Sequence, residues 1–215
     1  MIGRLSLPPE LDLLCIGAHA DDIEIGAGGT ILRLAGEGRL RSVRWVVLSA
    51  AGVRADEARE AASAFVDPSG ADLRTTIGNA RDGYFPASFT ELKDGFEALK
   101  LEFEPNLILT HRRDDLHQDH RLVGELTWNT YRHHTILEYE IPKYDADLVS
   151  PNVLVELPAA IVEHKWELLD AAYPSQRGRT WFSADTFRGL ARVRGVEAAA
   201  SSGFAEGFVG RKLTV

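Results

Sequence analysis

The chain has little cysteine and no long apolar run. Among its 215 residues there is one cysteine, Cys15, so no internal disulfide can form. No stretch approaches the ~18 consecutive apolar residues of a membrane-spanning helix, and segment 1–12 has neither a long apolar core nor a small-residue cleavage site. We therefore expect a cytoplasmic protein without an integral membrane segment, in which Cys15 packs in the core.

Basic residues are scarce relative to acidic ones. The 24 Lys and Arg residues face 32 Asp and Glu residues, which gives a formal net charge of -8 at pH 7. Because nucleic-acid binding requires a basic face that neutralises phosphates, this balance argues against a nucleic-acid partner. The sequence also lacks repeats, low-complexity segments and any linker long enough to separate domains. We expect one domain over residues 1–215, and a homo-oligomer is left open.

The apolar pattern predicts strands that alternate with helices. Short apolar runs alternate with amphipathic stretches, which is typical of a parallel sheet covered by helices. Strands are expected at residues 11–17, 42–49, 73–77, 107–110, 136–141 and 152–157. Helices are expected at 28–37, 54–65, 90–103, from 116 onward and at 159–172, with a loop at 18–24 and an interrupted tail. The expected fold class is α/β, a Rossmann-like three-layer α/β/α domain with a mostly parallel sheet.

Two clusters of polar residues follow predicted strands. The first reads AHADD at residues 18–22, and the second reads HQDH at residues 117–120. Each follows shortly after a strand, at the edge where open parallel sheets bind ligands. Histidine and carboxylate ligands suit zinc and similar ions, and a catalytic site typically takes three protein ligands and leaves one position for water. The two clusters therefore predict a metal centre and contain more candidate ligands than one ion needs.

Helical spacing divides these groups between two tasks. Residues three apart on a first helical turn point the same way, whereas adjacent residues diverge. His19 and Asp22 are therefore expected to converge on one ion. If His120 completes the set, two imidazoles and one carboxylate bind the ion and one coordination position stays open. Asp21 is then free to take a proton from a bound water molecule.

The rest of the second cluster belongs to the same predicted site. His117 is expected to face the space in front of the ion, and Asp119 can orient an imidazole. A structural explanation stays open, because the acidic pairs at 21–22 and 114–115 could simply cap helices beside solvated histidines. Two such clusters, each after a strand, favour the metal site.

Three further features have two interpretations each. Arg54 stands at a predicted helix start, where it either binds a substrate hydroxyl or phosphate or is a solvated arginine. His111 follows a strand and has either a structural role or a contact with the site. The glycines in segment 26–29 superficially resemble a dinucleotide-binding loop, but they form no G-x-G-x-x-G motif.

The two clusters resemble the motifs of the LmbE-like, or PIG-L, family of zinc-dependent N-deacetylases. The first family motif, Ala-His-Pro-Asp-Asp followed by Gly-x-Gly-Gly-Thr, is similar to AHADDIEIGAGGT at residues 18–30, with Ala20 in place of proline. The second, His-Pro-Asp-His-Arg, is similar to HQDHR at residues 117–121, with Gln118 as the exception. Shorter similarities extend over nearly the whole chain.

The resemblance implies a role for each group in the clusters. It implies that three residues bind zinc, namely His19, Asp22 and His120. Asp21 would be the general base, and His117 would stabilise the oxyanion or protonate the leaving amine. Asp119 would hold His117 in position, and Arg54 is the candidate that binds substrate.

The implied reaction is removal of the N-acetyl group from an N-acetylglucosamine-type conjugate, a small molecule, with release of acetate. Zinc is the expected cofactor, and iron, manganese or cobalt are alternatives because availability often decides which ion is bound. Two other functions stay open: hydrolysis of a different amide or a phosphoester, and an inactive family member with a binding role.

Overall fold

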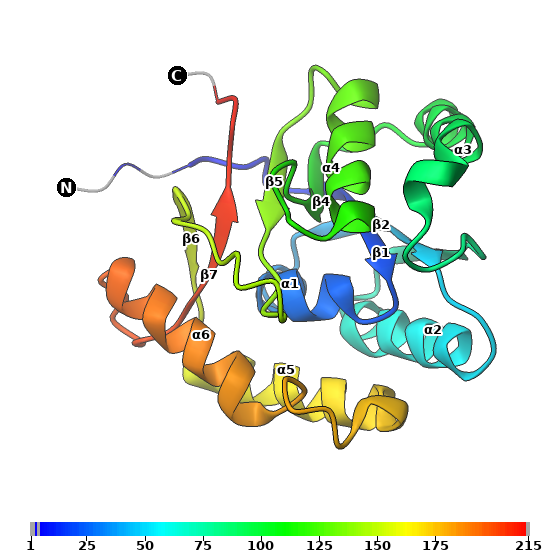
Figure 1. Cartoon of the computed structure of the whole chain (residues 1–215). Coiled ribbons are helices and arrows are strands. Elements are labelled where there is room, and N and C mark those ends of the chain that lie inside the picture. Colours follow the sequence, from blue (N-terminus) through cyan, green and yellow to red (C-terminus); the bar gives the residue numbers. More distant parts are fainter. Residues whose placement is uncertain (1–2, 4, 214–215) are drawn as a thin grey trace.

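A sheet of seven strands forms the centre of the computed structural model, which describes residue 3 and residues 5–213 (Figure 1). The strands are β1 (Leu11–His19), β2 (Leu40–Ser49), β3 (Asp72–Ile77), β4 (Leu107–His111), β5 (Ile136–Tyr139), β6 (Val153–Glu156) and β7 (Ala205–Val209). Their order across the sheet is β3-β2-β1-β4-β5-β7-β6. Strands β1 to β5 pair in parallel, whereas β7 is antiparallel to both β5 and β6.

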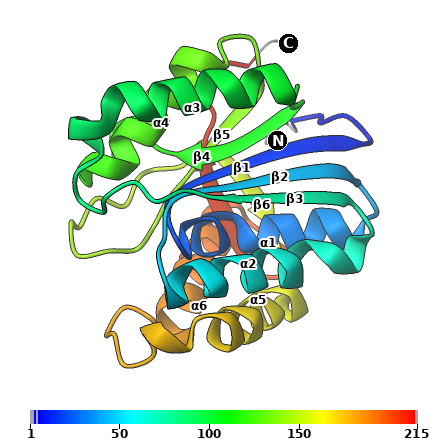
Figure 2. The ribbon, with the colours of Figure 1, turned by 90° about the vertical axis from the view of Figure 1, so that its right-hand side faces the viewer.

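Helices cover both faces of this sheet. They are α1 (Asp22–Gly36), α2 (Val53–Val66), α3 (Phe89–Glu102), α4 (Gln118–Thr130), α5 (Ala159–Ala172) and α6 (Ala184–Glu197), with short 3-10 turns at Asp67–Ser69, Phe85–Ser88 and Pro174–Gln176. Figure 2 shows α3 and α4 on one face and α1 and α2 on the other, with α5 packed on the outer side of α1 and α2. The expected three-layer α/β/α class is confirmed. None of these helices combines the length and the apolar character that crossing a membrane requires.

The apolar run in β1 is continuous because both faces of that strand are buried. Leu13 and Cys15 belong to the core between the sheet and helices α1 and α2. Leu14 and Ile16 belong to the core under α3 and α4. A strand of a parallel sheet that is covered on both faces carries such a run rather than an alternating pattern. The expectation that Cys15 packs in the core is confirmed, since its side chain is fully buried.

Helix α1 begins earlier than its sequence predicts. The sequence predicts a loop at 18–24 and a helix from residue 28, where the apolar residues at 31–35 share one helical face. In the structure β1 extends to His19, and α1 starts at Asp22 after one residue with positive φ, Asp21 at 87°. The glycines allow close packing: a Cβ atom on Gly26 would lie 2.3 Å from the ring of Tyr139.

The tail after residue 172 holds two elements that the sequence pattern did not predict. They are α6 and β7, and β7 inserts between β5 and β6. β7 is short and contains Gly207, so it has no clear alternation of apolar and polar residues. Its position depends on pairing with distant strands, which a local pattern cannot reveal. Several other boundaries differ from expectation by one or two residues; for example, β5 ends at Tyr139 and α4 begins at Gln118.

Candidate metal centre

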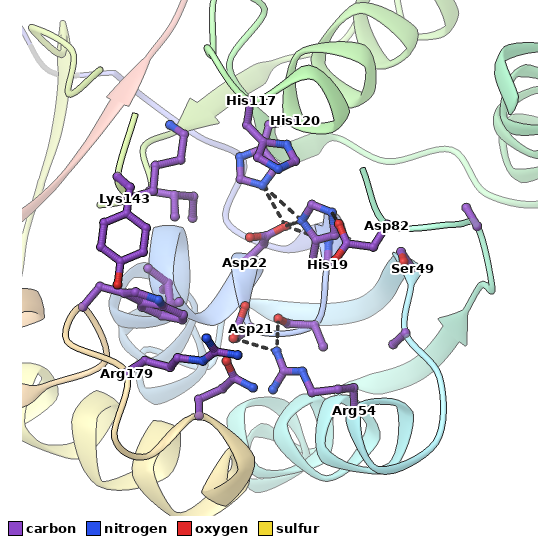
Figure 3. Close-up of a pocket in the computed structure, with 18 of the residues that line it drawn as sticks. His19, Asp21, Asp22, Ser49, Arg54, Asp82, His117, His120, Lys143 and Arg179 are labelled. Atoms are coloured by element: carbon purple, nitrogen blue, oxygen red, sulfur yellow. Dashed lines mark hydrogen bonds and ion pairs between the residues drawn. The ribbon is translucent and has the colours of Figure 1, made fainter. Parts of the chain in front are cut away.

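The predicted site residues gather at the carboxyl ends of β1 and β4. β1 ends at His19 and β4 ends at His111, and these strands are neighbours in the sheet. From β1 the chain continues to β2 on one side and later returns to β4 on the other side. This edge is therefore the topological switch point, where open α/β sheets bind ligands. Figure 3 shows His19, Asp22 and His120 pointing toward one another at this place.

Three side-chain atoms form a nearly equilateral triangle. His19 Nδ1 lies 3.2 Å from His120 Nε2, and both nitrogens lie 3.5 Å from Asp22 Oδ2. Tetrahedral zinc, with bonds of about 2.0–2.1 Å, places its ligand atoms about 3.3–3.4 Å from one another. The donor atoms thus fit an ion of this size. Ligand atoms also lie within 4.8 Å of one another in two other groups: His19, His117 and Asp119, and His111, Asp115 and His120.

The second nitrogen of each histidine in the triangle contacts a carboxylate. His19 Nε2 lies 3.0 Å from Asp82 Oδ1 and 3.2 Å from Asp119 Oδ2. His120 Nδ1 lies 3.3 Å from Asp115 Oδ2. Carboxylates in this position fix the tautomer of a metal-binding histidine and increase its basicity. The arrangement therefore presents one nitrogen of each ring to the centre of the triangle.

The electrostatic field at the triangle favours a cation. Burial lowers the pKa of His19, but the carboxylates of Asp119, Asp22 and Asp82 outweigh burial and raise that pKa to about 12. Burial acts to raise the pKa of Asp22, but His120 and His111 hold it well below its usual range. Carboxylates that hold a proton this tightly on His19 also attract a divalent ion.

Asp21 points away from the triangle, toward α2. Its side chain is 9% exposed, and its Oδ2 atom accepts a hydrogen bond of 2.7 Å from Arg54 Nη2. Burial raises the pKa of Asp21 to about 7, although the charge of Arg54 opposes this shift. Adjacent Asp21 and Asp22 thus have different partners, a guanidinium for one and imidazoles for the other (Figure 3).

Arg54 is held on both sides. Besides Asp21, its guanidinium donates to the carbonyl oxygen of Ala20 at 2.6 Å and to Glu57 Oε2 at 2.9 Å. Glu57 in turn accepts the backbone N–H of Ser175 at 2.9 Å. The structure therefore places Arg54 in the cavity wall with its charge matched by two carboxylates, and not as a solvated arginine at a helix end.

His117 is the N-cap residue of α4. Its Nδ1 atom accepts the backbone N–H of Asp119 at 3.3 Å, so in the neutral ring the proton lies on Nε2. Burial, together with the charges of His120 and His19, lowers the pKa of His117. The ring centroid lies 5.2 Å from that of His19. His117 is thus placed as a neutral hydrogen-bond donor beside the triangle.

The carboxylate of Asp119 points to the first cluster. It accepts the backbone N–H groups of Gly83 at 2.6 Å and Phe85 at 3.1 Å, and it contacts His19 as described above. Its backbone N–H, and not its carboxylate, makes the hydrogen bond to His117. The geometry therefore connects the Asp119 side chain to His19 more directly than to His117.

His111 lies fully buried behind the triangle. Its Nε2 atom accepts the backbone N–H of Ala18 at 3.0 Å and lies 3.1 Å from Asp22 Oδ2. Its ring stacks on that of His120 with centroids 4.0 Å apart. Burial lowers the pKa of His111 to about 4, so the ring is neutral. His111 thus packs against two of the predicted metal ligands.

Two carboxylates and one lysine of this site have no role in the sequence analysis. Asp82 follows β3, and Lys143 lies in the irregular segment after β5. For Asp115 the sequence suggests only a role as a helix cap. Lys143 Nζ lies 3.1 Å from Asp115 Oδ1, which also accepts the backbone N–H of His117 at 2.8 Å. The available signal was the position of Asp115, only two residues before the second cluster.

The triangle opens into a cavity of about 810 Å³. Its wall includes the site residues His19, Asp21 and His117 together with side chains from segments 141–145 and 176–181. Figure 3 shows Lys143 and Arg179 across this space from Asp82 and Ser49. The volume lies within the range of sites that bury a ligand of a few hundred daltons.

Comparison with known families covers both polar clusters. The family model PIG-L, described as GlcNAc-PI de-N-acetylase, matches residues 14–131, which is more than half of the chain. The chain belongs to the PIG-L family. The matched region runs from β1 to the end of α4 and thus contains all three corners of the triangle. A search of curated proteins finds no match.

Solved structures share the PIG-L fold at low sequence identity. The conserved protein TT1542 from Thermus thermophilus is 22% identical, with a TM-score of 0.72 over 95% of this chain and 96% of that chain. The N,N'-diacetylchitobiose deacetylase from Pyrococcus horikoshii is 22% identical, with a TM-score of 0.70 over 91% and 82%. GalB, the 4-carboxy-2-hydroxymuconate hydratase from Pseudomonas putida KT2440, is 19% identical, with a TM-score of 0.70 over 94% and 97%. The second of these structures is a deacetylase and the third is a hydratase, so the likeness establishes the fold alone.

Proposed function

We propose that this PIG-L family member is a metal-dependent N-deacetylase that removes the N-acetyl group from an N-acetylglucosamine-type conjugate and releases acetate. Membership of the family supports an amide hydrolase of this general kind. The diacetylchitobiose deacetylase of the same fold acts on an acetylated sugar, which supports the substrate class. The observation that carries the proposal is the triangle of His19, Asp22 and His120 beside the buried carboxylate of Asp21.

In this proposal His19, Asp22 and His120 hold one divalent ion. Zn²⁺ is the proposed ion, and Fe²⁺ suits the same two imidazoles and one carboxylate. When bound, such an ion polarises the acetamide carbonyl and lowers the pKa of a water molecule. The residues around the ion supply the remaining chemistry.

Asp21 acts as the general base. It accepts a proton from the attacking water molecule while the water oxygen bonds to the carbonyl carbon of the acetamide. Its raised pKa of about 7 suits this task, because the most effective base has a pKa near the working pH. Arg54 keeps the carboxylate oriented through the hydrogen bond to Oδ2.

His117 acts on the developing negative charge. Its Nε2–H donates to the carbonyl oxygen as the tetrahedral intermediate forms, which a preorganised donor stabilises more than it stabilises the substrate. The C–N bond then breaks, the amine nitrogen receives the proton taken up by Asp21, and the acetyl group leaves with the water oxygen as acetic acid, which ionises to acetate. Asp119 and Asp115 hold the rings of His19 and His120 during these steps.

The test combines metal analysis with acetate release. Wild-type protein, His120→Ala and the control His164→Ala are purified, and each is incubated with a panel of N-acetylglucosamine conjugates. His164 lies exposed on α5, far from the triangle in the sequence and absent from the cavity wall, so its removal should change neither quantity. We expect about one ion per chain and acetate release in the wild type and the control, and neither in His120→Ala.

The other outcomes separate the alternatives. Bound metal without acetate from any conjugate would contradict the proposed substrate and favour hydrolysis of another bond. The absence of bound metal in the wild type would overturn the mechanism and favour a binding role.

A further inference from the structure

The cavity is larger than the catalytic groups require. The predicted ligands and Asp21 form one part of its wall, segments 49–54 and 79–82 form another, and segments 141–145 and 176–181 form a third part, the outer wall. A cavity of about 810 Å³ falls in the range of sites for ligands larger than one sugar ring. The outer wall is therefore available to the group attached to the amino sugar.

Hydrogen bonds and packing hold this outer wall in place. Tyr144 and Thr180 join its two segments through their hydroxyl groups, which are 2.8 Å apart. Arg177 is fixed by Asp170, with Nε 2.9 Å from Oδ1 and Nη2 2.9 Å from Oδ2. Trp181, which lines the cavity, packs edge-on against Phe182 with ring centroids 5.6 Å apart. The wall is thus a built surface between two loops.

The cationic groups of the cavity differ in their partners. Arg54 is matched by Asp21 and Glu57, and Lys143 is matched by Asp115 and Asp147. Within residues 3 and 5–213, no carboxylate oxygen lies within 4.0 Å of the guanidinium of Arg179. Arg81 also lines the cavity without a carboxylate partner in the described residues, but its guanidinium lies over the ring of Tyr84, 3.6 Å from the ring centroid. Arg179 has neither kind of partner there.

Arg179 also points into the cavity. Figure 3 shows its guanidinium reaching inward from the rim, on the same side as Lys143 and across from Ser49. Asp145 lies on this rim as well, so one negative charge opposes an anion there. Arg177, its neighbour in sequence, is instead committed to Asp170. Arg179 is therefore the cation of this wall that can pair with a ligand.

We infer that the outer wall is a binding subsite for an anionic group on the substrate, a phosphate or a carboxylate attached to the amino sugar, and that Arg179 binds that anion. The planar guanidinium forms paired hydrogen bonds with either group. Trp181 and Tyr144 present ring surface to the sugar or its substituent. This inference rests on the proposed function for the acetamide end, but the anion contact is testable separately.

The kinetic test uses substrates that differ only in the anion. Acetate release is measured with metal-loaded enzyme from N-acetylglucosamine 1-phosphate, from the carboxymethyl glycoside and from the uncharged methyl glycoside. Arg179→Gln should raise KM for the charged substrates about 10-fold or more, leave kcat unchanged, and alter the methyl glycoside less than about 2-fold. Arg179→Lys should restore part of the effect. The charged substrate whose KM increases more in Arg179→Gln shows whether the subsite prefers phosphate or carboxylate.

Two further variants sharpen this result. Arg59→Gln removes the same charge from an exposed position on α2 and should leave all three substrates unchanged. Asp145→Asn removes the opposing charge from the rim and should lower KM for the charged substrates. Equal changes for charged and uncharged substrates in Arg179→Gln, or no change in either, would overturn the subsite.

A binding measurement separates the subsite from the reaction. Calorimetry with the metal-loaded protein compares glucosamine 1-phosphate with methyl glucosaminide, neither of which carries an acetyl group to remove. We expect at least about 10-fold tighter binding of the phosphate, lost in Arg179→Gln. If this holds while no conjugate releases acetate, the subsite stands and the proposed reaction fails. If phosphate binding survives in Arg179→Gln, the anion binds elsewhere and the subsite is overturned.

Discussion

Two strand-to-helix junctions supply the site, and they are built differently. At the β1–α1 junction only Ala20 and Asp21 separate the last residue of the strand from the first residue of the helix. At the β4–α4 junction residues 112–117 form a longer loop before α4 begins. The short junction is fixed by its backbone, in which Asp21 has a φ of 87°. The long junction depends on side chains that tie it to neighbouring segments.

Asp115 makes several of the side-chain contacts that hold the long junction. This carboxylate is 1% exposed and contacts the His120 ring, the backbone N–H of His117 and the amine of Lys143. Arg112, at the start of the loop, pairs with Asp147 at 2.9 Å. A substitution at the short junction therefore acts on the backbone at Asp21. The long junction also depends on contacts with distant residues, so substitutions outside it can change its conformation.

The largest effect is expected at the short junction, in Asp21→Asn. The amide cannot accept the proton of the attacking water, so the rate of acetate release should fall by about 10²–10⁴-fold. Metal content should stay at the wild-type value, because Asp21 faces Arg54 and not the triangle. Metal analysis beside the kinetic assay checks both statements. Loss of the ion in this variant would show that Asp21 is a ligand.

At the long junction, His117→Ala should have the next largest effect. Removing one preorganised donor to the oxyanion lowers kcat by about 10²–10³-fold. The three corners of the triangle are intact, so the ion should remain bound. Steady-state kinetics with metal analysis tests this, and a wild-type kcat would exclude the role assigned to His117.

Asp115→Asn tests whether side chains hold the long junction together. Loss of the carboxylate behind a ligand histidine typically lowers metal affinity by about 10–100-fold. Asp114→Asn is the matched control, because the neighbouring side chain is 58% exposed and does not contact His120. Competition with a chelator gives both affinities. Equal affinities in the two variants would mean that the backbone alone positions His120.

Gly26→Ala tests the packing behind the short junction and should have the smallest effect. The added methyl group would lie 2.3 Å from the Tyr139 ring, so we expect a loss of about 1–3 kcal/mol in the free energy of unfolding. Gly36→Ala, at the end of the same helix, meets no atom within 4 Å and should be neutral or stabilising by about 0.5–1 kcal/mol. Urea denaturation of both variants measures the difference. Equal stabilities would contradict the packing explanation for the glycines.

The sequence was informative where local patterns carry the information. The apolar runs of the buried strands predicted the parallel part of the sheet. His19 and Asp22 lie close together as their spacing suggested, although His19 ends β1 and is not part of the first turn of α1. Asp21 and Asp22 diverge as expected for neighbours at the start of a helix.

The sequence was less informative where distant segments meet. The contacts of Asp82 with His19 and of Lys143 with Asp115 join residues far apart in the chain, so no local spacing predicts them. The predicted start of α1 is too late because the spacing of apolar residues becomes clear only at Ile31, whereas the helix begins at Asp22. The insertion of β7 between β5 and β6 likewise depends on tertiary pairing.

The central claim is that His19 Nδ1, Asp22 Oδ2 and His120 Nε2 hold one metal ion. Anomalous diffraction at the zinc absorption edge from crystals of the zinc-loaded protein tests this claim most directly. We predict one anomalous peak about 2.0–2.1 Å from each of these three atoms. A peak at His111, Asp115 and His120, a peak at His19, His117 and Asp119, or the absence of a peak near His19 would contradict the claim.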